Sequence, residues 1–455
     1  MSKDYDTQYD KMTKTPVGEL IMKLSVPTIL SMLGTNIYNL VDTAFVGRLG
    51  NSASAAVGVV FGFMAILQAI GFMFGQGAGS MLSRMLGAKN QEMASKIAST
   101  GFFGSFILAS ITAVLSAVFV DPLVFALGST ATIAPYAKTY IYYILCTAPF
   151  MVSSFTLNNI LRYEGRAALG MIGLISGGLI NIIGDAVFMF GFKMGIAGAG
   201  LSTAISQVIS FMILLSMFLK GKTQCKISIK NVQYKSLMTF DIMATGLPSL
   251  LRQSLGSLGT IVMNIEAARF GGDAAVAAMS IVGRISFFLF AIALGIGQGF
   301  QPVSGYNYGA GKYNRLRQAY RFTMIAATVV MVAFSCGALL CSGSLIRIFR
   351  DDAEVVLIGT RALRLLCVGQ MFLPLCMVTE MLMQSTGKRG TASFLSSLRG
   401  GIIYIPALVI LAHFRGLYGV EEAQPLSFVL STFPAIYFAK LFFDKLPKED
   451  AKLES

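Results

Sequence analysis

The chain has 455 residues, of which 55% are hydrophobic and 13% are charged, and its mean hydropathy is +0.69. Soluble domains carry roughly 25% charged residues, so this composition is typical of a protein embedded in lipid. The net charge of +14 would suit a nucleic-acid partner, but the basic residues alternate from loop to loop. That alternation indicates membrane topology and argues against nucleic-acid binding.

Apolar stretches long enough to cross a bilayer, about 20 residues each, recur along the whole chain. They must be helices, because backbone groups in lipid need hydrogen-bond partners within their own segment. The sequence therefore predicts an all-α polytopic membrane protein with twelve spans. The expected spans are 20–42, 54–84, 96–119, 133–155, 167–191, 195–219, 242–268, 274–304, 320–345, 355–384, 391–413 and 426–443.

Many residues recur 222 positions later in the chain. Gly75-Gln76-Gly77 corresponds to Gly297-Gln298-Gly299, and Gly87-Ala88 corresponds to Gly309-Ala310. A constant offset over so many residues predicts two copies of one six-helix unit in the same order. In an apolar protein this pattern is typical of a transporter built from parallel repeats, with the substrate path at their interface.

Basic residues gather before span 1 and after every even-numbered span, whereas the alternate loops hold few. By the positive-inside rule, both termini are cytoplasmic and the number of spans is even. The N-terminal segment shows no signal peptide. We expect two pseudo-symmetric six-helix bundles in the cell membrane: an N-lobe at 1–219, a cytoplasmic linker at 220–240 and a C-lobe at 241–455.

Proline interrupts several of the predicted spans. It removes one intrahelical hydrogen bond and kinks the helix. Pro27 in span 1 and Pro248 in span 7 come within one residue of matching across the repeats. We expect a bent helix at the start of each bundle, with Pro27 as a candidate hinge. The alternative is that membrane helices simply carry more proline than soluble ones.

Ionisable groups within a membrane are costly and by default mark an ion or substrate pathway. Four acidic residues fall well inside the predicted spans: Asp42, Asp185, Glu266 and Glu380. At the repeat offset, Asp42 corresponds to Asn264 and Asp185 corresponds to Ala407. The scaffold is thus duplicated but this carboxylate pair is not, as expected for an ion site in one lobe only.

Polar residues share helix faces with the first two acids. Span 1 carries a stripe with spacings of four, four and three residues: Ser31, Thr35, Asn39 and Asp42, flanked by Asn36 and Tyr38. Span 5 places Asn181 one turn before Asp185, and span 6 places Thr203 one turn before Gln207. This oxygen-rich set suits Na⁺ or a proton shared between carboxylates. A structural hydrogen-bond cluster between helices is the alternative.

The second half carries its own charges within spans: Arg252, Glu266, Arg284, Glu380 and Arg399. The Glu and Arg side chains either neutralise each other or contact a charged substrate. The many Met and Phe residues are compatible with an adaptable substrate surface, and equally with ordinary packing.

Several motifs carry a family resemblance. The most specific segment runs from Pro27 to Gly50 and includes Asn36-Ile37-Tyr38-Asn39-Leu40-Val41-Asp42-Thr43. Others are Gly79-Ser80, Leu86-Gly87-Ala88-Lys89, Asn181-Ile182-Ile183-Gly184-Asp185, Gly195-Ile196-Ala197-Gly198-Ala199-Gly200, Gly297-Gln298-Gly299 and Asn307-Tyr308-Gly309-Ala310. From about Gly18 to Phe443, the chain resembles the multidrug and toxic compound extrusion (MATE) family.

The resemblance implies two six-helix lobes that face each other across a cavity, and rocker-type antiport driven by Na⁺ or H⁺. It also implies an ion site in the N-lobe, with Asp42 and Asp185 as carboxylates and Asn181 and Thr203 as further ligands. The two aspartates are then candidate ligands of a Na⁺ ion.

Further positions are carried over with the resemblance. Tyr38 and Asn158 match cavity or network residues, and Pro27 matches the proline associated with bending of the first helix. Other branches of the family place their coupling acids in helices 7 and 10, where Glu266 and Glu380 lie. Coupling through the C-lobe therefore stays open.

We expect an antiporter that exports amphipathic, cationic drugs or toxins in exchange for Na⁺ or H⁺, acting as a monomer and without a cofactor. The candidate cavity and substrate residues are Asn36, Tyr38, Asn39, Asn158, Gln207, Glu266, Arg284 and Glu380.

The sequence leaves two alternative functions to consider. The first is a flippase for a lipid-linked saccharide or another anionic lipid, with Arg252, Arg284 and Arg399 on a pyrophosphate. The second is a channel or an intramembrane enzyme. The sequence contains no Ser/His pair, HExxH motif or filter-like repeat that would indicate either, so we do not expect an enzyme.

Overall fold

The computed structural model describes residues 3–233 and 237–451, and all regular elements in these ranges are helices. Ten of the described helices are long and apolar enough to cross a membrane. One of them, α9 (Met238–Gly309), breaks at Gly272, whose φ is 59°, and so contains two predicted spans. A bent pair, α12 (Ala353–Gln370) and α13 (Leu373–Ser385), supplies one more. Ten helices, one break and one bent pair together give the twelve-helix fold that the sequence predicts.

The chain forms two compact units, each described here by itself. Unit 1 comprises the described residues up to Tyr9 together with Leu30–Gly246, and unit 2 comprises Asp10–Ile29 and the described residues from Leu247 onward. Helix α2 (Val17–Gly47) therefore changes unit two residues after Pro27, and α9 changes unit directly before Pro248. The lobe limits expected from the sequence stay a prediction.

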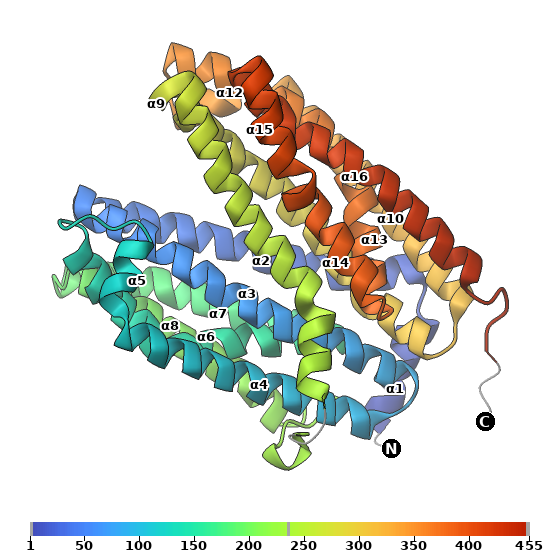
Figure 1. The fold of residues 1–455 in the computed structure, drawn as a ribbon. Helices are drawn as coiled ribbons and strands as arrows, with labels where there is room; N and C mark the ends of the chain where they lie inside the picture. The colour runs from blue at the N-terminus through green and yellow to red at the C-terminus, as the bar shows by residue number, and fades with distance from the viewer. Residues whose placement is uncertain (1–2, 234–236, 452–455) are drawn as a thin grey trace. The chain divides into compact units, whose positions relative to one another are not determined.

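Unit 1 is a helical bundle (Figure 1). Besides most of α2, it contains α3 (Asn51–Gly87), α4 (Gln91–Val118), α5 (Val120–Ala126), α6 (Ala134–Tyr163), α7 (Ala167–Asp185), the π-helix η1 (Ala186–Gly191) and α8 (Ile196–Leu219). Helix α6 lies at the centre, packed against α3, α4, α7 and α8. Its buried face, with Tyr140, Ile144 and Val152, forms one hydrophobic core with Val60 and Leu67 of α3.

Unit 2 contains α9 from Leu247 onward and the helices that follow it. These are α10 (Tyr313–Leu340), α11 (Ser342–Phe349), α12, α13, α14 (Arg389–Ser397), the π-helix η3 (Leu398–Ile402), α15 (Tyr404–Arg415) and α16 (Leu417–Lys445). Helix α16 packs against α12, α13 and α15. The span expected at 355–384 is not straight, because Pro374 in the first turn of α13 cannot continue the preceding helix, and the pair bends by 47°.

Hydrogen bonds attach the polar linker that follows α8 to helix α4. The Ser95 hydroxyl accepts from the Lys226 N–H at 3.1 Å. The Ser99 hydroxyl donates to the Lys226 carbonyl at 3.1 Å and accepts from the Ser228 N–H at 3.1 Å. Successive turns of one helix thus hold an irregular segment in place.

A buried carboxylate fixes the start of this linker. Glu164, at the end of α6, is 0% exposed and accepts the N–H groups of Gln224 at 3.0 Å and Cys225 at 2.8 Å. Burial raises the pKa of Glu164, because desolvation outweighs the two backbone hydrogen bonds. The Gln8 side chain donates to the Glu164 carbonyl at 3.0 Å, so α1 (Lys3–Lys14) joins the same cluster.

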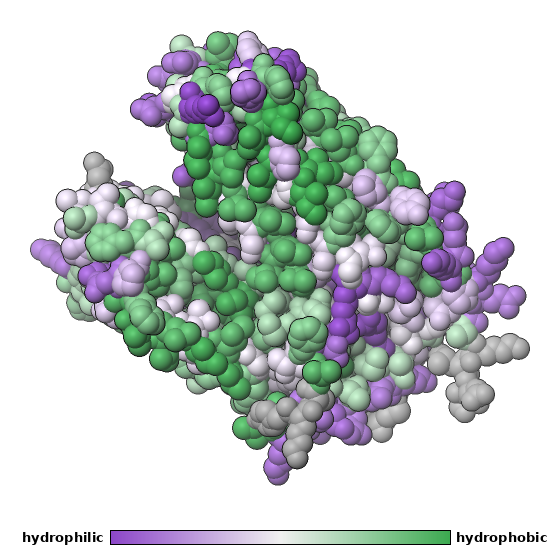
Figure 2. Space-filling view, viewed as in Figure 1, coloured by the Kyte–Doolittle hydropathy of each residue, from purple (hydrophilic) through white to green (hydrophobic). Residues whose placement is uncertain are grey.

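Hydrophobic side chains cover the middle of the helices, and hydrophilic ones gather at their ends (Figure 2). Exposed apolar residues are frequent in mid-helix, for example Ile107 on α4 at 48% and Val329 on α10 at 61%. This distribution is expected for helices whose outer surface contacts lipid.

Candidate functional site

Two aspartates from different helices meet inside unit 1. Asp42 on α2 is 3% exposed, and Asp185, the last residue of α7, is 0% exposed. Their carboxyl groups lie close enough to interact directly. The structure thus brings together two acids that are 143 positions apart, since 185 minus 42 is 143.

Side chains of α6, α7 and α8 form a hydrogen-bonded network beside the two acids. The Asn181 amide donates to the hydroxyls of Ser202 and Thr203, each at 3.3 Å. The Ser202 hydroxyl donates in turn to the Asn181 carbonyl at 2.9 Å. The hydroxyls of Tyr140 and Thr203 are 3.4 Å apart. Asn181 and Thr203 therefore share one hydrogen-bonded cluster, and their role as ion ligands stays a prediction.

Small residues let these helices approach closely. A Cβ atom at Gly184 of α7 would lie 2.5 Å from the Ser202 hydroxyl, so a larger residue would displace that hydroxyl from the network. At Gly178 a Cβ would lie 2.9 Å from the Tyr38 ring, which is how α2 seats its aromatic side chain on α7. One turn beyond Asp42, the rings of Phe45 and Phe190 meet edge to face at 5.7 Å.

The helix changes its geometry directly after Asp185. Residues 186–191 form the π-helix η1, whose wider turn follows without a break from α7. Such single-turn π segments are frequent at functional sites, because they re-aim side chains and loosen the backbone ladder. The carboxylate of Asp185 therefore sits where regular α-helical geometry ends.

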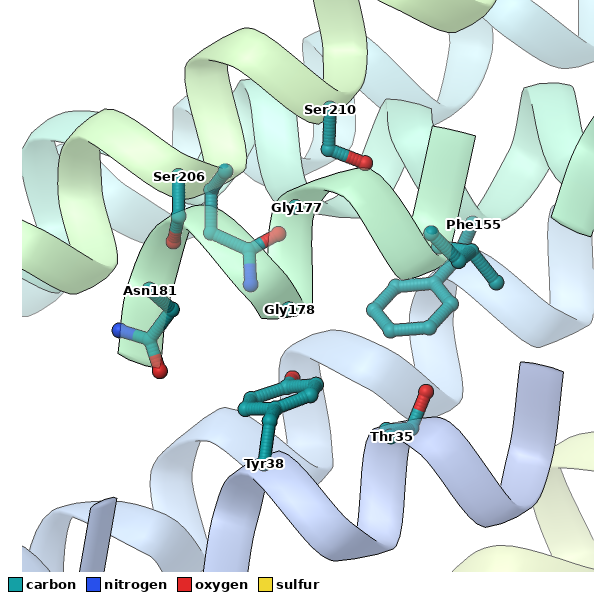
Figure 3. Close-up of a pocket in the computed structure, with 10 residues that line it drawn as sticks. Thr35, Tyr38, Phe155, Gly177, Gly178, Asn181, Ser206 and Ser210 are labelled. Atoms are coloured by element: carbon teal, nitrogen blue, oxygen red, sulfur yellow. The ribbon is translucent and has the colours of Figure 1, made fainter. Parts of the chain in front are cut away.

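A small pocket opens beside this network (Figure 3). It has a volume of about 20 Å³, enough for one water-sized occupant. Tyr38 and Thr35 project from α2, and face Gly177, Gly178 and Asn181 of α7 across the pocket. The Gln207 side chain of α8 lines it as well and interacts with the Tyr38 hydroxyl.

The hydrogen bonding of the carboxylate oxygens shows whether a cation would fit between Asp42 and Asp185. Within the described residues, Oδ1 of Asp42 and both Oδ atoms of Asp185 are buried and have no hydrogen-bond partner. A buried polar group without a partner is costly, and two close carboxylates in a low dielectric also repel each other. One shared proton or one hard cation relieves both costs, so the donor set fits H⁺ or Na⁺. No group of three or more His, Cys, Asp or Glu able to hold a metal ion occurs in the described ranges.

The remaining candidates of unit 1 lie around this centre. Asn36 and Asn39 are half-buried on α2. Asn158 of α6 is half-buried too and packs against Gly170 of α7, where a Cβ would lie 2.6 Å from its amide nitrogen. These placements are compatible with a polar lining, and their roles stay a prediction.

The candidates of unit 2 have a different environment. Glu380 on α13 is 0% exposed; one carboxylate oxygen lies 2.6 Å from Nη1 of Arg252, and the other lies 3.7 Å from Nη2 of Arg399. Glu266 lies 4.0 Å from the exposed Arg269, one turn further along α9, and Arg284 is exposed. The sequence leaves two interpretations of these charges, mutual neutralisation and contact with a charged substrate. The surroundings of Glu380 agree with mutual neutralisation.

Two members of the unit 1 network were not foreseen. Ser202 could have been found, since Ser202, Ser206 and Ser210 recur every four residues on one face of α8. Tyr140 carries no comparable signal, because it belongs to a segment with several tyrosines and only packing selects it.

Comparisons with known proteins agree with this architecture. The MatE family profile matches residues 27–187 and 248–410. The multidrug export protein MepA of Staphylococcus aureus (strain MSSA476) is 27% identical over 449 residues, covering 98% of this chain and 99% of the relative. MepA of Staphylococcus haemolyticus (strain JCSC1435) is 26% identical over 449 residues, with the same coverage.

Solved structures give the same result. One is described as the outward-facing conformation of a multidrug resistance MATE family transporter of the MOP superfamily. It superimposes with a TM-score of 0.91 and 25% sequence identity, covering 97% of this chain and 99% of that chain. The matched residues span both repeats, and 99% of the MepA relative is covered. The chain belongs to the MatE family, the MATE efflux transporters of the cell membrane.

Proposed function

We propose that this transporter is a secondary active antiporter that exports amphipathic cations in exchange for Na⁺ or H⁺, with Asp42 and Asp185 as the coupling pair. The observation that carries the proposal is the set of three buried carboxylate oxygens without hydrogen-bond partners in the described residues. The relatives described as multidrug export proteins support drug export as the direction and kind of transport.

In the proposed cycle, the two carboxylates have two states. They either bind the coupling ion or stay charged, and the charged state favours binding of the drug. When the ion binds, it neutralises the pair and removes the cost of burying two like charges. The Asn181 amide and the Thr203 hydroxyl orient towards the ion, and α2 repacks on α7 through Tyr38. Drug and ion then compete through one two-state element, so that each weakens binding of the other.

Helix α2 is suited to carry this change. Pro27 lies inside it, half-buried, and a proline within a helix leaves one carbonyl without its intrahelical donor. The change of unit between Ile29 and Leu30 falls within one turn of that proline. We therefore propose Pro27 as the hinge of a rocker-type movement, with both termini on the cytoplasmic side and one chain as the functional unit.

The lipid flippase is the weaker candidate. It needs arginines that are available for a pyrophosphate, but Arg252 and Arg399 contact the carboxylate of Glu380. The remaining arginine, Arg284, is exposed on α9. Catalysis is not part of the proposal either, since a transport cycle accounts for the site.

The test is efflux of a fluorescent cationic dye from proteoliposomes that contain the purified protein. A Na⁺ gradient and a pH gradient are imposed separately. Efflux driven by one of them supports the antiporter and identifies the ion. If neither gradient drives efflux of a correctly folded protein, while a labelled anionic lipid is moved between leaflets, the antiporter is wrong and the flippase is right.

A further inference from the structure

A second cavity, of about 280 Å³, lies in unit 2 and takes no part in the proposed transport cycle. It is found where α9 and α16 end and where α10 and α14 begin. Its polar lining consists of Lys388, Lys445, Tyr308, Tyr313 and Thr391. This end of the unit carries the basic loops that predict the cytoplasmic side.

The chemistry of this lining selects an anion. Two ammonium groups and three hydroxyls can all donate hydrogen bonds into the cavity. No acidic side chain is among the lining residues of the described chain, and neither lysine forms an ion pair with a described carboxylate. A phosphate group offers several acceptor oxygens and a negative charge, which match lysines and hydroxyls.

The walls of the cavity are held by contacts of their own. The Arg317 guanidinium donates to the carbonyls of Leu446 at 3.0 Å and Pro447 at 2.9 Å, which fixes the chain after α16. The Tyr308 ring lies 6.2 Å from Tyr313 and 6.3 Å from Phe442, measured between ring centroids. These contacts fix the helix ends and two of the rings around the cavity, which lowers the ordering cost of binding.

The surroundings favour a lipid as the source of the phosphate. Leu441 of α16 lines the cavity, and the exposed apolar residues Phe433, Ile436 and Tyr437 precede it on the same helix at 65%, 53% and 63% exposure. Hydrophilic side chains gather where α10 begins and α16 ends (Figure 2). The cavity thus joins a lipid-facing surface to a basic one, as binding sites for anionic headgroups do.

The first repeat has different residues at the positions that correspond to this cavity. At the repeat offset, Lys445 corresponds to Thr223, and Thr386 corresponds to Glu164. In unit 1 the Glu164 carboxylate binds the linker N–H groups of Gln224 and Cys225. The basic position is shared, because Lys388 corresponds to Arg166, but the first repeat fills this place with an acid and the linker and has the neutral Thr223 where the second has Lys445.

We propose that this cavity binds the phosphate-bearing headgroup of an anionic phospholipid, with the acyl chains along the exposed apolar face of α16. Lys388 and Lys445 contact the phosphate, and Tyr308, Tyr313 and Thr391 donate to its oxygens or to the glycerol.

The test uses the full-length protein in neutral detergent, with phosphatidylglycerol or phosphatidylcholine added and bound lipid counted by native mass spectrometry. The double variant Lys388→Gln/Lys445→Gln should bind phosphatidylglycerol roughly thirtyfold more weakly, since each lysine near an anionic headgroup contributes about a fivefold gain in affinity. Lys222→Gln/Lys230→Gln removes the same charge from the linker and should bind like the wild type. If the double variant does not fold, Lys445→Gln alone should lose about fivefold.

Unchanged phosphatidylglycerol binding in folded pocket variants would overturn the proposal. So would equal binding of phosphatidylcholine and phosphatidylglycerol to the wild type. Inorganic phosphate is the third arm: if it displaces phosphatidylglycerol at equal concentration, the cavity is a site for a soluble anion and the lipid assignment is wrong.

Discussion

The two repeats share a fold but carry their buried charge in opposite ways. The candidate ion site of unit 1 pairs two buried carboxylates, Asp42 and Asp185, and three of their oxygens have no hydrogen-bond partner in the described residues. The cluster around Glu380 in unit 2 places one buried carboxylate beside two guanidiniums. The first arrangement is incomplete without a cation, whereas in the second the arginines already compensate the charge of the carboxylate.

The repeat offset shows that this difference is reciprocal. Asp42 and Asp185 correspond to Asn264 and Ala407, while Asn158 corresponds to Glu380. Likewise Gly177, which lines the small pocket of unit 1, corresponds to Arg399 of the ion cluster. Each unit thus has charges where the other has neutral residues. A duplicated scaffold can in this way keep one copy as a titratable site and use the other as a rigid partner.

The largest expected effect comes from removing the charge of unit 1. Asp42→Asn should reduce gradient-driven dye efflux by on the order of a hundredfold, since the coupling between ion and drug is lost. Asp273→Asn, an exposed acid next to the break in α9, is the matched control and should transport normally. Full gradient dependence in Asp42→Asn, measured in proteoliposomes, would place coupling elsewhere.

A substitution in the ion cluster of unit 2 should lower the stability of the protein and leave the coupling between ion and drug intact. Glu380→Gln leaves two buried guanidiniums without their carboxylate, which costs about 3 kcal/mol in buried ion pairs. We expect a lower thermal midpoint in detergent, with efflux per folded molecule still gradient-dependent. Glu422→Gln breaks an exposed pair with Arg415 and should change stability little. Loss of coupling with unchanged stability in Glu380→Gln would mean that unit 2 carries the ion.

The packing of Tyr38 against Gly178 of α7 gives a further test, with a smaller expected effect. In Gly178→Ala the new Cβ would lie 2.9 Å from the Tyr38 ring, so α2 must shift on α7. Overpacking of this kind costs about 1 kcal/mol, and we expect a several-fold loss of efflux. Gly62→Ala on α3 meets no atom within 4 Å and is the control. Equal efflux in both variants would show that the contact of Tyr38 with α7 is dispensable.

The smallest effect concerns the linker anchor. Burial raises the pKa of Glu164, so the folded protein keeps this proton at pH values where the unfolded chain has released it. The stability that Glu164 contributes is therefore full below the ordinary pKa of Glu and is lost as the pH rises through the raised value. Thermal melts should show the wild type losing stability relative to Glu164→Gln as the pH rises above the ordinary pKa of Glu. A constant difference would refute the buried-acid account; the exposed Glu449→Gln is the control.

Local patterns and the repeat account for most of what could be predicted from the sequence. Gly165 and Gly387 recur at the offset because both end a helix with a positive φ, 80° and 82°. Span positions follow from hydropathy, and the stripe on α2 follows from helical spacing. The contacts of Tyr140 and the triad around Glu380 could not be predicted, because they join helices whose relative rotation depends on packing. Arg252 and Glu380, for instance, are 128 positions apart.

The most direct test of the account is equilibrium binding of a fluorescent cation to the purified wild type and to Asp42→Asn, at varied Na⁺ concentration and pH. The account predicts that Na⁺ or acid weakens dye binding to the wild type by on the order of 5- to 150-fold, and leaves binding to Asp42→Asn unchanged. Dye affinity that ignores both ions in the wild type, or that responds equally in the variant, would contradict coupling through the aspartates of unit 1.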